Sequence, residues 1–413
     1  MNKIVVAHPF QQHSFKTARA VKECGCLHSY VTTVYLKSTG LTKIVTDHLE
    51  GDNKSRANGR NCKYLKDEEV CTLNEFVGLM LLLVQRVVPK LYKVFANFVI
   101  ESFNRSLYKY VVKHNIDTVI VYDAVSEGFI RRVRKNKKKI RIILDMSAPY
   151  WGYMGAQFEQ DAIEHIDTES DLLKFVNSNE FNQKLKKCKF EVENSDLYLV
   201  ASDVSRDSLL YAGIDENKIV KCVYGIDDFS IKENSKAEKE STPLRIVFVG
   251  NVTPQKGAYQ LLRAAEKLPV EDYEFDFYGN YNPESKLIKT TATNVHFHGH
   301  IPRVEISKAY MAADVLVFPS LCDGFGFVTA ESLLCGTPVI ASTNGGSKEL
   351  IKNGYNGFVY DVHSDSQLVS ILKELQSNQG LLEQLKANAR ISVQNYTWDK
   401  YNQSISNAIN DEK

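Results

Sequence analysis

The sequence lacks several features that would place it in a common class of protein. Its 51 basic and 50 acidic residues leave a net charge of only +1, so it has no general attraction for nucleic acid. Its longest apolar run, residues 76–84, is much shorter than the about 20 residues of a membrane-spanning helix. The chain passes almost at once into a strand-like run at residues 4–7, so we expect no signal peptide.

The cysteines also lack a metal-binding pattern. None belongs to a CxxC pair, and no cluster of histidines accompanies them, which argues against a zinc site. Unpaired cysteines and the missing signal peptide fit a reduced, cytoplasmic setting. The eight positions are Cys24, Cys26, Cys62, Cys71, Cys188, Cys222, Cys322 and Cys335.

Two successive series of strand and helix patterns indicate two α/β domains. A chain of 413 residues exceeds the usual size of a single core. The first series has apolar, β-branched runs at residues 4–7, 118–122, 140–144 and 197–200, separated by helical patterns, one of which begins with Ser14 as its cap. Residues 45–110 are mixed and largely helical in pattern, and we interpret the polar stretch 52–60 as a mobile loop.

A polar, charged stretch at residues 232–243 reads as a linker, because it contains no large apolar residue. Strand patterns resume at residues 244–249, 274–278, 295–297 and 315–318. We therefore predict a first domain over 1–231, the linker 232–243, a second domain over 244–395 and a C-terminal helix over 396–413. Two doubly wound domains form a cleft, and ligands bind in it beyond the carboxyl ends of the strands.

Residues 318–342 are the most informative part of the chain, because they run strand, glycine loop, helix and strand. Gly324 and Gly326 allow the backbone to approach a ligand closely, and the N-terminus of the helix that follows attracts an anion such as phosphate. Asp323 precedes the helix, and Glu331 lies about two turns into it. The pattern alone equally fits an ordinary βαβ unit with a solvated Asp and Glu.

This stretch resembles the signature of the retaining family 4 glycosyltransferases, in which two acids bracket seven residues and the first, normally Glu, precedes Gly-Phe-Gly. The likeness spans about residues 244–362, with further motifs in the family's order at 248–257, 295–301, 310–315 and 344–350. It implies the GT-B architecture, with two Rossmann-like domains facing across a cleft and the last helix crossing back onto the first domain. It also implies a UDP- or GDP-sugar donor and no need for a metal or other cofactor.

The resemblance assigns roles within this cleft. Lys256 would stabilise the diphosphate leaving group, Glu331 would accept hydrogen bonds from the ribose hydroxyls, and Asp323 would face the hydroxyls of the donor sugar. The family normally has Arg where this chain has Asn251, so Lys256 must supply more of the charge unless Arg263 or Arg303 compensates. The predicted catalytic residues are Lys256, Asp323 and His13, and the predicted donor-binding residues are Gly250, Asn251, Gly324, Phe325, Gly326, Phe327 and Glu331.

Histidines form two further candidate groups. His8 and His13 flank the loop after the first strand, which points into the cleft, so either can reach a sugar or can instead serve in capping and packing. His296, His298 and His300 alternate along a predicted strand and would all face one side. A metal site there is the weaker interpretation, because the resembling family needs no metal.

A basic run at residues 131–141 is either a solvated helix end or a surface that docks on anionic lipid at the inner face of the membrane. From all of this we predict an enzyme that transfers a sugar from a nucleotide-sugar to a sugar, glycan or lipid-linked glycan, in the synthesis of cell-surface polysaccharide or glycoconjugate. The alternatives are a non-catalytic nucleotide-sugar-binding relative and a nucleotide-sugar epimerase of the same fold.

Overall fold

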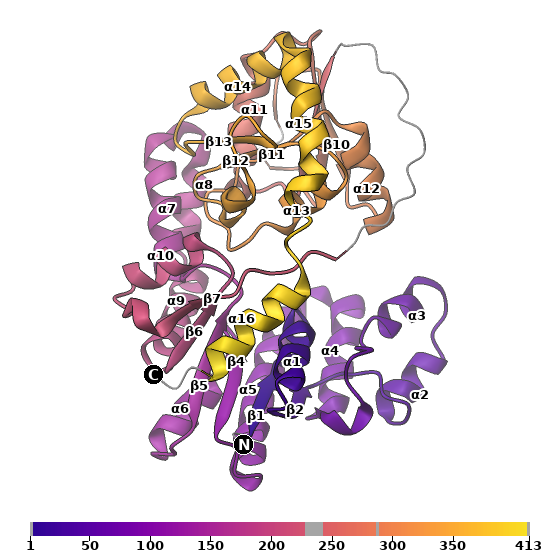
Figure 1. Cartoon of the computed structure of the whole chain (residues 1–413), viewed down its shortest axis with the longest axis vertical. Coiled ribbons are helices and arrows are strands. Elements are labelled where there is room, and N and C mark those ends of the chain that lie inside the picture. Colours follow the sequence, from indigo (N-terminus) through magenta and orange to yellow (C-terminus); the bar gives the residue numbers. More distant parts are fainter. Residues whose placement is uncertain (1–2, 228–242, 286–288, 411–413) are drawn as a thin grey trace.

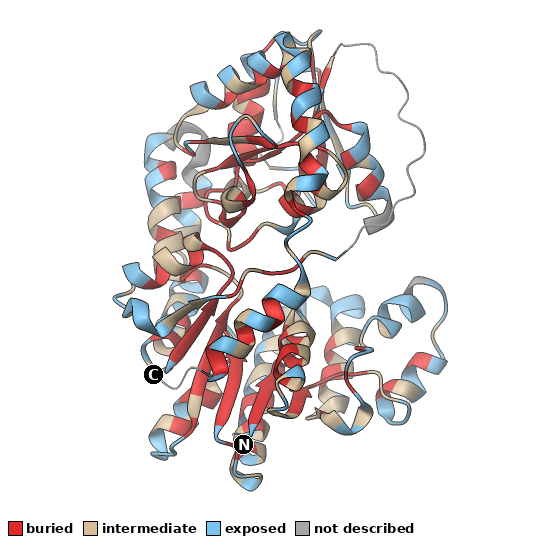
Figure 2. Ribbon diagram, viewed as in Figure 1, coloured by how far each residue is buried: buried red, intermediate tan, exposed pale blue. Residues whose placement is uncertain are grey.

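The computed structural model describes residues 3–227, 243–285 and 289–410, which build two parallel sheets flanked by helices (Figure 1). The central strands are buried, whereas the helices expose their outer faces (Figure 2). The predicted linker at 232–243 lies outside the described residues except for its last position.

The described part of the first half of the chain contains a parallel seven-stranded sheet with the order β3-β2-β1-β4-β5-β6-β7. Its central strands consist of apolar, mostly β-branched residues that are buried on both faces, as expected for a sheet covered by helices on both sides. The strands are β1 (Ile4–Ala7), β2 (Leu27–Thr32), β3 (Val70–Thr72), β4 (Thr118–Tyr122), β5 (Arg141–Met146), β6 (Leu197–Val200) and β7 (Ile219–Lys221).

The helices of this half depart from the prediction at two places. His13, and not Ser14, is the N-cap of α1, because the Ser14 hydroxyl is buried and bonds the Tyr30 hydroxyl at 2.9 Å. The stretch 52–60, predicted as a mobile loop, is mostly helical and belongs to α3. The helices are α1 (Ser14–Glu23), α2 (Leu41–Asp47), α3 (Gly51–Asn58), α4 (Glu75–Val87), α5 (Tyr92–Lys113), α6 (Glu127–Lys135), α7 (Trp151–Glu164), α8 (Ile166–Val176), α9 (Asn179–Glu193) and α10 (Asp203–Tyr211), with the short 3-10 turns η1 (Asp67–Glu69), η2 (Pro89–Leu91) and η3 (Glu216–Lys218).

The second half forms a parallel sheet of six described strands with the order β10-β9-β8-β11-β12-β13. The core lies on both faces of this sheet, where apolar residues of β8 and β11 pack against helices from either side. Its elements are β8 (Leu244–Val249), η4 (Pro254–Lys256), α11 (Ala258–Glu266), β9 (Tyr273–Tyr278), β10 (Val295–Gly299), α12 (Arg303–Ala312), β11 (Val315–Phe318), α13 (Phe327–Leu334), β12 (Val339–Ser342), η6 (Gly346–Leu350), β13 (Gly357–Tyr360), α14 (Asp365–Ser377) and α15 (Gln379–Ser392).

The final helix, α16 (Trp398–Asn410), returns to the first half and packs along α1 (Figure 1). Tyr401 is buried there, and its hydroxyl bonds the Thr17 hydroxyl at 2.8 Å. Arg19 of α1 forms an ion pair with Asp399 at 2.9 Å. None of the helices in the described parts of the chain is both long enough and apolar enough to cross a membrane.

Candidate functional site

The loop that carries Lys256 is held against the carboxyl end of β11. Gly257 has φ +70°, and a Cβ at this position would lie 1.9 Å from the carbonyl oxygen of Pro319, so the close approach requires glycine. The Leu321 amide donates to the carbonyl of Gln255 at 3.1 Å. These contacts fix Lys256 beside the start of the predicted glycine loop.

Lys256 and Asp323 form an ion pair at this position. The Asp323 carboxylate also accepts a hydrogen bond from the Phe325 amide at 3.3 Å, and its own backbone bonds the loop after β12. The lysine side chain is 37% exposed and the aspartate side chain 16% exposed, so the ammonium group lies at the mouth of the site and the carboxylate lies inside it. The two predicted residues therefore lie side by side.

The helix α13 begins immediately after this pair. Gly326, its N-cap, has φ +71°, and no side chain caps the helix end, so the first amides of the helix are open to an anion. Nearby Ser347 has a buried hydroxyl that bonds nothing among the described residues. This hydroxyl lies 3.0 Å from where a Cβ of Gly326 would be, which makes Ser347 a further candidate donor that the sequence pattern did not reveal.

Glu331 lies farther along α13, and one of its carboxylate oxygens accepts a hydrogen bond from the Tyr310 hydroxyl at 3.4 Å.

On the other side of the loop, Gly279 approaches Gly250 so closely that a Cβ on Gly279 would lie 1.9 Å from the Gly250 carbonyl oxygen. The neighbouring Asn251 is exposed and accepts a long hydrogen bond from Asn280 at 3.4 Å.

The suggested replacement cation Arg263 does not serve this site. Its guanidinium group forms two hydrogen bonds, of 2.8 and 3.1 Å, to Asp365 at the start of α14, so it links two helices of the second half. Burial would raise the pKa of Asp365, but the hydrogen bonds from Arg263 outweigh it and lower this pKa. The side chain of Arg303, the other suggested cation, lies outside the described part of the structure.

Tyr224, which the sequence analysis missed, joins the two halves. Its ring stacks on Phe327 with centroids 5.5 Å apart and meets Phe325 edge-on at 5.2 Å. It also contacts the ring of His13 at 4.5 Å. Burial, followed by the nearby Asp145 carboxylate, raises the pKa of Tyr224 well above its ordinary value, so its hydroxyl remains a neutral donor.

His13 is hydrogen-bonded to a buried acid. Its Nε2 lies 2.9 Å from the carboxylate of Asp145, which stands near the carboxyl end of β5, and 3.2 Å from the Tyr224 hydroxyl. Thr17 donates a hydrogen bond to the same carboxylate oxygen at 3.3 Å. The structure thus connects the predicted residue His13 to the Phe325 and Phe327 loop through Tyr224, and it adds Asp145 as the acid that orients the imidazole.

His8 has the packing role that the sequence left open. It is 1% exposed, and its Nδ1 accepts the Phe10 amide hydrogen at 2.9 Å. Its ring meets Tyr122 edge-on with centroids 4.8 Å apart. Burial lowers the pKa of His8 to about 3, so the imidazole is neutral in the folded protein.

We expect the buried His8 to make the protein less stable as the pH falls from about 6.5 to about 3. In this range the unfolded chain binds a proton at His8 and the folded chain does not, which costs up to about 1.4 kcal/mol per pH unit. Burial raises the pKa of Asp123 to about 6 and that of Glu191 to about 8, so these two acids act in the opposite direction and make the protein more stable as the pH falls. They contribute equally to the unmodified protein and to a variant at His8.

The variant His8→Asn keeps an acceptor for the Phe10 amide and removes the titration, so its stability should fall less steeply between these pH values. Urea unfolding at a series of pH values measures the difference, and His300→Asn, at an exposed histidine, is the matched control. A slope equal to that of the unmodified protein would contradict the assignment.

Two of the alternating histidines contact acids of a neighbouring strand. His298 lies 2.6 Å from Asp276 and His296 lies 3.6 Å from Glu274, both on the adjacent strand β9. The prediction that His300 belongs to the same strand is wrong, because β10 ends at Gly299. Across the described residues, no three His, Cys, Asp or Glu side chains gather as metal ligands would.

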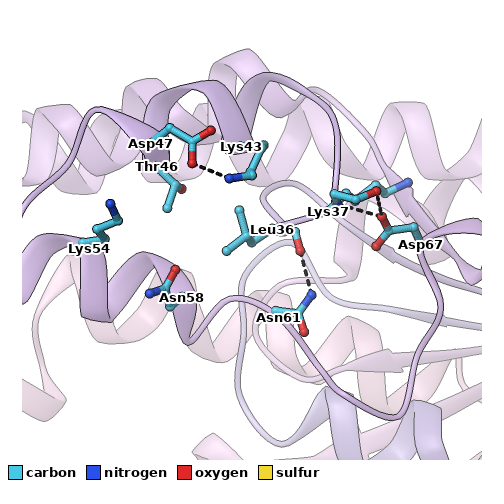
Figure 3. Close-up of a pocket in the computed structure, with 10 residues that line it drawn as sticks. Leu36, Lys37, Lys43, Thr46, Asp47, Lys54, Asn58, Asn61 and Asp67 are labelled. Carbon is cyan, nitrogen blue, oxygen red and sulfur yellow. Dashed lines mark hydrogen bonds and ion pairs between the residues drawn. The ribbon is translucent and has the colours of Figure 1, made fainter.

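A polar pocket of about 420 Å³ opens between α2, α3 and the segment after β2 (Figure 3). The first loop is tied to its rim, because Gln11 donates a hydrogen bond to the Gly59 carbonyl at 2.9 Å. Lys43 pairs with Asp47 across one wall, whereas Lys54 extends into the pocket from α3 (Figure 3). The lining residues are Leu36, Lys37, Ser38, Lys43, Thr46, Asp47, Lys54, Asn58, Asn61 and Asp67.

The basic run is largely paired within the first half. Arg131 bonds Glu127 at 2.6 Å, Arg132 pairs with Glu101, and Arg134 bonds Asp196 at 2.8 Å. Val133 within the run is buried. Arg132 and Arg134 therefore fasten α6 to its neighbours, and the exposed cations of the run are Arg131 and the lysines that follow.

Comparison with known proteins places these features in context. Residues 230–392 match the model of the family described as glycosyl transferases group 1. An uncharacterized glycosyltransferase of Methanocaldococcus jannaschii is 25% identical over 347 residues, which cover 79% of this chain and 92% of that protein.

Two solved structures resemble the whole chain. Sucrose-phosphate synthase from Thermosynechococcus elongatus superposes with a TM-score of 0.63 at 16% identity, over 98% of this chain and 97% of that one. Anabaena HepE in complex with UDP-glucose superposes with a TM-score of 0.60 at 15% identity, over 99% of both chains. These likenesses confirm the predicted GT-B architecture of two parallel-sheet α/β domains.

Proposed function

We propose that this glycosyltransferase, whose group 1 domain covers residues 230–392, moves a sugar with retention from a UDP- or GDP-sugar to a sugar, glycan or lipid-linked glycan, as family 4 enzymes do. The single observation that carries the proposal is the pairing of Lys256 with Asp323 directly before the uncapped N-terminus of α13. A cation, an acid and free helix amides in one place suit a sugar diphosphate. The structural relative with bound UDP-glucose supports this choice of donor.

In this proposal the diphosphate binds at the start of α13, where amides of the helix and the Lys256 ammonium stabilise the charge that develops on the leaving group. Asp323, with the backbone of Gly324 and Phe325, receives the hydroxyls of the donor sugar, and Glu331 receives those of the ribose. Lys256 then bridges the acid and the phosphate. Asp323 is one methylene shorter than the usual Glu of the family, and its pairing with Lys256 gives it a defined position despite this.

The first domain supplies the acceptor side of the proposed site. His13, held by Asp145 and contacting Tyr224, lies where the two halves meet. The polar pocket beside the first loop, with Lys54 extending into it, suits the hydroxyl and anionic groups of a glycan acceptor (Figure 3). Such a protein would act in the cytoplasm and, with a lipid-linked acceptor, at the inner face of the membrane.

We expect His13→Gln to lower kcat by about tenfold or more while the affinity for the nucleotide stays within about twofold, because the proposed contact of His13 is with the reacting sugars. Initial rates and calorimetric titration with UDP measure the two quantities. The matched control is His28→Gln, in the same domain on β2. A lower nucleotide affinity without loss of turnover would contradict this role.

The deciding experiment incubates the protein with UDP-, GDP- and ADP-sugars, with and without a panel of glycan acceptors. A transferase releases nucleotide and forms a glycoside only when acceptor is present, and on this proposal it does so in excess EDTA. An epimerase would isomerise the donor without an acceptor. A non-catalytic relative would bind the donor and leave it unchanged, so each outcome identifies one class.

A further inference from the structure

The hairpin formed by α4, η2 and α5 exposes an unusual amount of apolar surface. On α4 the exposed side chains recur at helical spacing and form one stripe, and a second stripe begins α5. The two meet at the turn, where Val87 is 68% exposed, Leu91 55% and Val94 71%. The exposed apolar residues are Phe76, Leu83, Val87, Val88, Leu91, Val94 and Phe98.

The tip of this hairpin, residues 83–94, lies at the edge of the first sheet where the strands end. The apolar face of α5 packs on the sheet, and its last residue, Lys113, leads directly to the start of β4. A helix of 22 residues is about 33 Å long, so its first residue lies at the opposite, carboxyl edge. Lys93 bonds Glu180 at 2.8 Å. Glu180 lies at the start of α9, and α9 likewise ends just before the beginning of a strand, β6.

The charges of the hairpin have one sign. Residues 76–100 contain no Asp or Glu, whereas Arg86, Lys90 and Lys93 cluster at the tip, and all three are exposed. Arg86 donates a hydrogen bond to the neutral side chain of Asn53, so the positive charge of Arg86 is not neutralised. The charge of Lys93 is partly neutralised by Glu180. Apolar side chains flanked by cations suit a surface that is apolar in its interior and anionic at its rim.

We propose that the tip of the α4–α5 hairpin inserts Val87, Val88, Leu91 and Val94 into an anionic lipid surface, with Arg86 and Lys90 at the level of the headgroups. Leu41, Ile44 and Val45 of α2, which packs against α4, expose a further apolar face in this part of the first half. Because the tip lies at the carboxyl edge of the sheet, the docked protein presents the cleft to the membrane.

This surface is separate from the basic run. Lys137, Lys138 and Lys139 immediately precede β5, so they lie at the edge where the strands begin. In Figure 1, α6 lies toward the lower left of the first half and α4 lies toward its right. A flat bilayer that contacts the hairpin tip therefore leaves these three lysines in solvent.

Flotation of the full chain with liposomes tests the proposal. We expect binding to vesicles of phosphatidylglycerol and phosphatidylcholine, and at least tenfold weaker binding for the triple variant Val87→Ser, Leu91→Ser, Val94→Ser. Arg86→Gln with Lys90→Gln should abolish the preference for phosphatidylglycerol and the weakening by salt. Circular dichroism and UDP binding establish that each variant is folded.

Two matched variants serve as controls. Ile391→Ser with Ile163→Ser removes equally exposed apolar side chains from α15 and α7 and should bind as the unmodified protein does. Lys137→Gln, Lys138→Gln, Lys139→Gln should also bind normally. Failure of the unmodified protein to bind any vesicle, or equal losses in the hairpin and the lysine variants, would overturn the proposal.

Discussion

Replacing Lys256 by Ala should lower turnover about a hundredfold, which corresponds to about 2.7 kcal/mol of lost transition-state stabilisation. In the proposed site this ammonium group stands next to the leaving diphosphate, and Asn251 takes the place of the second cation that the resembling family has. Arg263 is occupied by Asp365 and does not replace it. Initial-rate measurements with saturating donor and acceptor determine kcat.

Two further variants complete this test. Lys267→Ala removes a lysine from the end of α11 that bonds Asp365 at 3.2 Å, and it should leave the rate nearly unchanged. Asn251→Arg in the Lys256→Ala background should recover part of the lost activity, because it restores a cation on the same loop. If Lys256→Ala retains more than about a tenth of the activity, another group carries the charge.

Replacing Glu331 by Gln should weaken nucleotide binding by about 1.5–3 kcal/mol, or roughly ten- to a hundredfold. The change keeps the shape of the side chain and removes the ionised acceptor proposed for the ribose hydroxyls. Isothermal titration with UDP and GDP measures the affinity. The same titration also identifies the nucleotide base of the donor, because the affinity for the preferred nucleotide should fall the most.

Glu305→Gln on the neighbouring helix α12 is the matched control, since Glu305 pairs with Lys308 at 2.9 Å and lies outside the proposed site. Thermal unfolding shows whether the variants remain folded. A folded Glu331→Gln protein with unchanged affinity would remove Glu331 from the donor site.

Most strands that the sequence revealed are largely apolar runs, and one, at residues 274–278, alternates apolar and acidic residues. Residues 118–122 and 244–249 are bounded in the structure as predicted, because each is an apolar or β-branched run in the middle of a sheet, interrupted only by the exposed Arg245. In contrast, β2 contains His28 and Ser29, and β3 has only three residues, so neither gave a recognisable strand pattern. Both lie at one edge of the first sheet, where strands are less fully covered and their residues need not all be apolar.

The site was predictable where one local motif holds its residues. Asp323 and Glu331 are fixed relative to each other by a single loop and helix. The contact of Lys256 with Asp323 was less evident, because it depends on the approach of Gly257 to Pro319 from a distant loop.

Tyr224 and Asp145 were not predictable in the same way. Tyr224 lies in an irregular segment after β7, and its role arises only from the packing of the two halves. An acid near the end of the apolar strand β5 was the one local sign of Asp145, and nothing in the sequence near it indicated that His13 was its partner.

The return of α16 to α1 has a consequence for synthesis on the ribosome. The first sheet is complete at residue 221, but the residues that cover α1 are made only after all the strands of the second sheet. They are Tyr401, Ile405, Ala408 and Ile409. Until they emerge, the Thr17 face of α1 lacks its cover, although the rest of that half can already fold. The first half therefore reaches its final packing only after the second half has been made, so the two halves cannot mature independently of each other.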